Sequence, residues 1–163
     1  MSHQQSCVLF HFRTPGISRR DVRAFAGMLQ ADVAGGRGFV CLVAGDGELL
    51  RLNRDFLKKN YPADVLSFPA LEAGASLGEI AISFERAREH ASEHGHTVEA
   101  EIRILMLHGV LHLLGFDHER DSGEMARAER KWRGHFELPT GLIERSRPRA
   151  APGAGRVRGR VPA

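Results

Sequence analysis

The strongest constraint in this sequence is an apolar segment that contains histidines. Residues 104–114 read ILMLHGVLHLL, which is apolar nearly all round a helix, so the helix should be buried. Thr97 can begin this helix and Gly115 can end it, which predicts a helix from Thr97 to about Leu114. His108 and His112 lie inside it, and the ring nitrogens of buried histidines need partners.

A shared metal ion would provide those partners. His108 and His112 are four residues apart, so both rings leave the same helix face. Gly115 lets the chain turn back, and His118 then follows as a third ligand. Three histidines with one open position are typical of catalytic zinc. The competing interpretation, three separately satisfied core histidines, is disfavoured by the spacing. Asp117 could orient a ring from outside the ligand set, or accept a proton, and we prefer the first role.

The reaction class follows from one residue inside the triad. The spacing matches the protease pattern HExxHxxGxxH, but Gly109 stands where the protease has its glutamate base. A peptidase would therefore lack the group that deprotonates water. Three neutral ligands leave the full charge of zinc, which suits an anionic phosphodiester and would lower the pKa of bound water toward about 7.

A second histidine group stands earlier in the chain. His90 and His94 are four residues apart, and His96 follows. The surrounding helix, ERAREHASEH, is charged throughout, so we expect these histidines to be solvated, with no apolar wall and no functional metal.

The rest of the chain predicts a single small domain. Apolar runs predict four strands, and capping residues with helical periodicity predict about five helices. Some strand pairs lack a crossover helix, which favours a mixed four-stranded sheet in an α/β (α+β) fold, with the zinc in a cleft. The predicted strands are 7–12, 38–44, 65–69 and 77–82. The predicted helices start at Ser18, Asp46, Ser83, Thr97 and about Asp121.

Charge divides the chain into two parts. Residues 145–163 contain six arginines and no acidic residue, so removing them changes the formal net charge from +3 to 3 − 6 = −3. We expect a catalytic domain over residues 1–144 and a disordered arginine-rich tail over residues 145–163. The tail is either a solvated extension or an electrostatic arm for RNA.

Cysteines and hydropathy bear on the compartment. Cys7 and Cys41 each lie in an apolar run and are expected to be buried, reduced thiols. Neither a signal peptide nor a membrane-spanning stretch is expected. Together these features favour the cytoplasm and no membrane partner.

Three sequence blocks resemble the YbeY family of endoribonucleases. HGVLHLLGFDH (108–118) is similar to its histidine signature, LNR (52–54) followed by PADVLSFP (62–69) to its second block, and GEIAIS (78–83) to its GDI strand. The resemblance covers roughly residues 7–137. It implies a small α/β domain in which His108, His112 and His118 hold one zinc ion.

The resemblance also implies a function. By this resemblance the chain is similar to metal-dependent endoribonucleases that cut single-stranded segments of small-subunit (16S) ribosomal RNA, notably at the 3′ end. Members of the family also act in ribosome quality control. The implied partners are ribosomal RNA, the small ribosomal subunit and an assembly GTPase. Two rival functions stay open: a metal-dependent hydrolase of another bond, and a non-catalytic assembly factor in which a fourth ligand (Asp117, Glu119 or Asp121) closes the shell of a structural zinc.

The chain departs from the family pattern at three positions. Leu57 stands where the family often has an arginine, Ala63 replaces a threonine, and Glu79 replaces an aspartate. Lys58 and Lys59 could supply the positive charge missing at Leu57. A lysine ammonium is a point charge, however, and lacks the planar guanidinium with which arginine binds two phosphate oxygens at once. For both lysines, contact with RNA and plain solvation remain open. Asp64 is expected to be structural, and Ser67 either faces the cleft or is an ordinary sheet hydroxyl.

Overall fold

A four-stranded mixed sheet organises the protein. The computed structural model describes residues 5–72 and 74–139. The strands are β1 (Cys7–Phe10), β2 (Gly38–Ala44), β3 (Val65–Pro69) and β4 (Ser76–Ser83). Their order is β1-β2-β4-β3, with β1, β2 and β4 parallel and β3 antiparallel to β4. The predicted mixed sheet is confirmed, and β3 lies at its edge.

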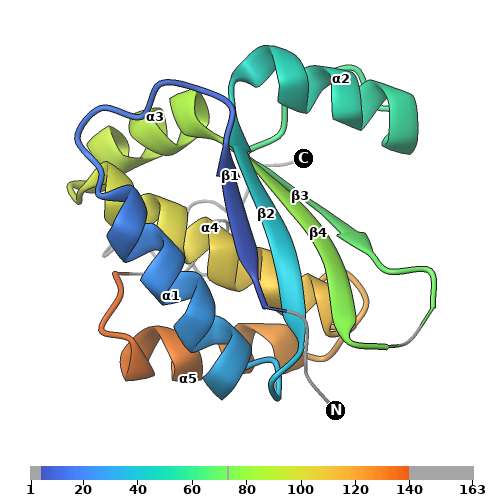
Figure 1. Ribbon diagram of the computed structural model, residues 1–163. Helices are drawn as coiled ribbons and strands as arrows, with labels where there is room; N and C mark the ends of the chain where they lie inside the picture. The colour runs from blue at the N-terminus through green and yellow to red at the C-terminus, as the bar shows by residue number, and fades with distance from the viewer. Residues whose placement is uncertain (1–4, 73, 140–163) are drawn as a thin grey trace, which may run out of the picture.

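Five helices complete this part of the chain. They are α1 (Arg19–Asp32), α2 (Asp46–Leu57), α3 (Phe84–His94), α4 (Val98–Leu113) and α5 (Glu124–His135). In Figure 1, α1, α4 and α5 gather on one side of the sheet, and α2 lies apart from them at the top right. None of these helices has both the length and the apolar character needed to cross a membrane.

Side-chain alternation divides the apolar residues between the two faces of the sheet. Ile80 and Ile82 of β4 belong to the main core with α1, α4 and α5. Ala81, between them in the strand, must point to the opposite face. There it joins a smaller cluster with Leu49 of α2 and Leu66 of β3. The larger core therefore fixes α4 against one face of the sheet, and α2 covers part of the other.

Most helix starts follow the predicted capping chemistry. The side chains of Ser18, Ser83 and Thr97 each accept a hydrogen bond from the backbone N–H three residues on, at 3.0–3.1 Å. The prediction for Asp46 is wrong, because Gly45 is the cap of α2. The Asp46 carboxylate instead accepts a hydrogen bond from the Ser83 hydroxyl at 2.7 Å.

Other boundaries differ from the predictions for local reasons. β1 ends at Phe10 instead of residue 12, although the His11 N–H still donates to the Val43 carbonyl at 2.8 Å. α5 begins at Glu124 instead of about Asp121. The Asp121 carboxylate accepts from the N–H groups of Gly123 and Met125, both at 2.8 Å, so it supports the turn before the helix.

The cysteine prediction is half right. Cys41 is buried, and its burial raises the pKa of the thiol to about 12. Cys7 is exposed, because it belongs to an edge strand that only β2 pairs. The predicted tail, residues 145–163, lies outside the described residues.

Candidate metal centre

The turn after α4 brings the three predicted histidines together. Gly115 has a left-handed φ of +102°, which glycine adopts without strain. Its N–H donates to the His112 carbonyl at 2.9 Å, and the Phe116 N–H donates to the Leu111 carbonyl at 3.1 Å. This is the Schellman pattern of helix termination. The turn reverses the chain, so that His118 reaches the face of α4 that carries His108 and His112.

The three rings surround one point. The ring centroid of His108 lies 4.8 Å from that of His112, and His118 lies 5.6 Å from each of them. One ring nitrogen from each residue lies within 4.8 Å of the other two. His108 is buried, while His112 and His118 are partly exposed. The cluster is therefore anchored in the core and reaches solvent on one side.

A buried carboxylate that the sequence analysis missed orients the first histidine. Glu129 of α5 is 1% exposed, and its Oε2 lies 2.8 Å from Nδ1 of His108. An ionised carboxylate only accepts, so Nδ1 of His108 carries the proton and Nε2 keeps its lone pair. Histidine ligands of metals usually have such an outer partner. A carboxylate on the same helix face as buried Met125 and Ala126 was the available signal.

The second histidine is held in its neutral form. Burial lowers the pKa of His112, and the neighbouring His108 and His118 lower it further. A hydrogen bond to the backbone of Phe116 and the charge of Asp117 act in the opposite direction. The net shift is downward, which favours the neutral imidazole that binds metals.

The residues present fit a divalent metal ion. Nδ1 of His118 is buried and has no hydrogen-bond partner. A buried polar atom without a partner costs about 1–3 kcal/mol of stability. Metal binding by the three histidines would offset this cost. The set is all nitrogen, which suits zinc and its neighbours in the first transition row.

The carboxylates near the cluster lie outside the donor group. Within the described part of the chain, the group contains the three histidines alone. Asp117 accepts from the Glu119 N–H at 3.1 Å, and Asp121 accepts from two backbone N–H groups. The orienting role predicted for Asp117 remains a prediction, while the carboxylate hydrogen-bonded to a ring is Glu129.

Gly109 has a packing role that the sequence did not show. A Cβ atom at Gly109 would lie 2.9 Å from Cγ2 of Ile80, so a side chain there would force Ile80 or the α4 backbone to shift. The Gly109 carbonyl also accepts a hydrogen bond from the Ser67 hydroxyl of β3 at 3.3 Å. The position of the protease glutamate therefore faces the sheet.

A groove lies beside the sheet and α2. Its volume is about 850 Å³, and its lining includes Leu57 and Ser67. None of the three clustered histidines lines it. Lys58 and Lys59 are exposed just beyond α2, and Nζ of Lys58 donates to the Asp55 carbonyl at 3.3 Å. Contact of these lysines with RNA stays a prediction.

The other histidine group is less solvated than predicted. His96 has a side chain that is only 11% exposed, and its Nε2 lies 2.6 Å from the fully buried Glu101 carboxylate. His90 is also partly buried, and its Nε2 lies 3.0 Å from Asp64. The prediction of a solvated segment without a wall is wrong for these two residues, because α3 packs against α4 and Asp64 contacts His90 from the chain before β3. The structural role expected for Asp64 agrees with this contact.

Comparisons with known proteins agree with one another. The family model described as Endoribonuclease YbeY matches residues 28–137. A curated protein of that name from Solibacter usitatus is 57% identical over 145 residues, covering 88% of this chain and 97% of the relative. Its namesake from Koribacter versatilis is 46% identical over 140 residues, covering 85% and 91%.

A solved structure supports the fold alone. The solution structure of a Thermotoga maritima protein superposes with a TM-score of 0.57 at 24% identity, covering 80% of this chain and 91% of that one.

Proposed function

Because the chain belongs to the YbeY endoribonuclease family, we propose that it is a zinc-dependent endoribonuclease that cuts single-stranded ribosomal RNA in small-subunit maturation, at the 3′ end of 16S RNA, and in ribosome quality control. The observation that carries the proposal is the convergence of His108, His112 and His118, with one nitrogen from each within 4.8 Å of the others. The zinc, the cleavage site and the strand preference are the parts that need experiment.

The chain's own residues prepare the metal centre in two ways. Glu129 holds the proton of His108 on Nδ1, so the other nitrogen faces the metal position with its lone pair. The lowered pKa of His112 keeps that ring neutral near pH 7. When bound, zinc supplies a Lewis acid that polarises the phosphoryl oxygen and activates water. The partly exposed side of the cluster is where an RNA phosphate would approach.

The donor set favours catalysis over a purely structural zinc. A structural site closes its shell with four protein ligands, whereas a catalytic site keeps one position for water or substrate. In the described residues no carboxylate joins the three histidines. A non-catalytic assembly factor is therefore the weaker alternative.

A peptidase is the other alternative, and the packing around Gly109 argues against it. The glutamate of the protease pattern would have to replace Gly109, where an added Cβ would lie 2.9 Å from Cγ2 of Ile80. We expect no cleavage of casein by the metal-loaded protein, under conditions in which it cuts RNA.

Partners and substrate contacts extend the proposal. We propose ribosomal RNA, the small ribosomal subunit and an assembly GTPase as partners, in the cytoplasm. Lys58 and Lys59 would contact the RNA backbone in place of the family arginine at Leu57. Residues 1–144 would form the catalytic domain, and the six arginines of residues 145–163 would add electrostatic affinity for RNA. Deleting residues 145–163 should flatten the dependence of RNA affinity on salt.

The central experiment compares wild-type protein with His112→Ala. Single-stranded ribosomal RNA is the substrate, bound zinc is quantified, and circular dichroism monitors the fold. We expect loss of stoichiometric zinc at this centre and a fall in cleavage of more than about a hundredfold, since a metal Lewis acid contributes several kcal/mol. His135→Ala is the matched control, because His135 is an exposed histidine of α5 outside the cluster. Cleavage that survives the loss of this zinc would place the active site elsewhere.

A further inference from the structure

We propose that His90, Glu93 and His94 of α3 form a second binding site for a divalent transition-metal ion, separate from the three-histidine centre. One donor atom from each residue lies within 4.8 Å of the other two. Although the sequence predicts no functional metal here, the structure brings a mixed nitrogen and oxygen donor set together. The residues stand at i, i+3 and i+4, which places all three on one face of the helix.

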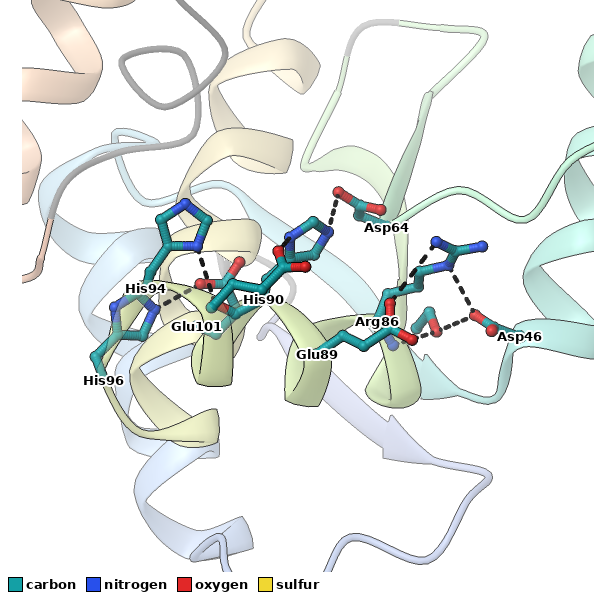
Figure 2. Close-up of polar contacts among 10 residues, drawn as sticks. Asp46, Asp64, Arg86, Glu89, His90, His94, His96 and Glu101 are labelled. Carbon is teal, nitrogen blue, oxygen red and sulfur yellow. Dashed lines mark hydrogen bonds and ion pairs between the residues drawn. The ribbon is translucent and has the colours of Figure 1, made fainter. Parts of the chain in front are cut away.

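Asp64 prepares His90 for such a role from outside the helix. Its Oδ2 lies 3.0 Å from Nε2 of His90, and Figure 2 shows the carboxylate reaching the ring from the chain before β3. The other nitrogen, Nδ1, faces the Glu93 carboxylate at 3.5 Å. A carboxylate on one ring nitrogen and a metal on the other is the usual arrangement of a histidine ligand.

His94 is also held in a defined position. Its Nδ1 donates to the backbone carbonyl of His90 at 2.9 Å, so the ring is fixed along the helix. The rings of His90 and His94 have their centroids 6.3 Å apart. His96 stacks next to His94 with centroids 6.1 Å apart, but its Nε2 is taken by Glu101. His96 therefore serves as a wall and stays outside the ligand set.

The helix that carries the site is anchored at its start. Ser83 caps α3 and donates its hydroxyl hydrogen to Asp46, while Nε of Arg86 lies 3.5 Å from the same carboxylate. In Figure 2, Arg86 and Asp46 lie at the opposite end of α3 from His94 and His96. All three proposed ligands therefore stand on a helix whose start is fixed, and the His90–Asp64 contact joins that helix to the chain before β3.

The chemistry selects the class of ion. Imidazole and carboxylate donors suit Zn²⁺, Ni²⁺ and Cu²⁺, whereas Ca²⁺ and Mg²⁺ prefer oxygen alone. Metal–donor bonds of about 2.0–2.2 Å put tetrahedral donors roughly 3.5 Å apart, so the side chains must move inward from the present arrangement. Glu93 has a side chain that is 66% exposed, which leaves it room to move. We expect weaker binding than at the buried centre.

The second site, on α3, lies near the first turn of α4, whereas the three-histidine centre lies at the last turn of α4. Glu101, which holds His96 beside His94, lies in the first turn of α4, and His112 lies in its last turn. The two sites share no residue, so each can be removed alone.

The test counts zinc ions bound per chain at equilibrium, using dialysis against buffered zinc and elemental analysis. Wild-type protein should bind two equivalents, and His94→Ala should bind one. His112→Ala should keep the weaker equivalent. Asp64→Asn should weaken the second equivalent about ten- to a hundredfold, as loss of an outer carboxylate does elsewhere. His135→Ala should still bind two.

Several outcomes would overturn the proposal. Wild-type protein that binds a single equivalent excludes the second site. Two equivalents in both His94→Ala and Glu93→Gln would place the second ion on other residues. Unchanged affinity in Asp64→Asn would exclude its orienting role. Because Glu93 and His94 are exposed, both variants should fold, and circular dichroism checks this.

Discussion

Glu129→Gln tests how the chain orients its metal ligands. Glu129 and His108 are 1% and 5% exposed, and their contact of 2.8 Å is shielded from water. The substitution keeps the size of the side chain and an oxygen that can accept from Nδ1 of His108. It removes the negative charge of the carboxylate. That charge strengthens the hydrogen bond from Nδ1 of His108 and makes the imidazole a better donor to a metal, so both effects are lost in the variant.

The size of the effect follows from the role of the carboxylate. Loss of such an outer partner weakens metal binding about ten- to a hundredfold, which corresponds to about 1.4–2.7 kcal/mol. We expect the folded structure to persist, because glutamine fills the same volume. Glu129→Ala would be a poorer test, since it would leave a buried ring nitrogen of His108 without a partner.

The assay is a competition between the protein and a zinc chelator of known affinity. Glu124→Gln is the matched control, because Glu124 belongs to the same helix but has a side chain that is 53% exposed. Its contact with the Ser122 N–H can be kept by the glutamine oxygen. Equal zinc affinity at the three-histidine centre in Glu129→Gln and wild-type protein would refute the orienting role of the carboxylate.

Three further perturbations test the fold. An alkylating reagent should modify Cys7 in the native protein and reach Cys41 only on unfolding, because burial raises the pKa of Cys41 to about 12; rapid modification of both would contradict the burial. Gly109→Ala should lower the free energy of unfolding by about 1–3 kcal/mol through overpacking, whereas the control Gly134→Ala, whose added Cβ meets nothing within 4 Å, should stabilise α5 by up to about 1 kcal/mol. Urea titrations measure both free energies, and a Gly109→Ala variant as stable as the wild-type protein would refute the close packing of α4 on β4. Backbone hydrogen bonds lower the pKa of Asp121 in the folded protein. Its contribution to stability is therefore present above the unfolded pKa of about 3.9 and is lost as pH falls through the lower folded value. The difference in unfolding free energy between wild-type protein and Asp121→Asn should shrink in acid, and a difference that stays constant with pH would contradict the lowered pKa.

Local chemistry carried most of the fold prediction. Ser18, Ser83 and Thr97 cap helices as expected, because a cap depends on a side chain and an N–H three residues away. The errors occur where distant residues decide. The Asp46 carboxylate accepts a hydrogen bond from Ser83 instead of capping its own helix. The two residues are 37 positions apart in the chain, so no local pattern reveals this contact.

The metal centre divides in the same way. The spacing of His108, His112 and His118 determined by itself that three rings would meet, because a helix repeats every 3.6 residues and Gly115 permits the turn. Only the tertiary structure selected Glu129, from a helix that begins after the histidine segment, as the carboxylate on His108. Only the packing of α3 against its neighbours set Asp64 beside His90. Local sequence spacing determines which metal-binding side chains share one face of a helix. The outer partners of those side chains depend on how separate helices and strands pack, and that packing is set by the whole core.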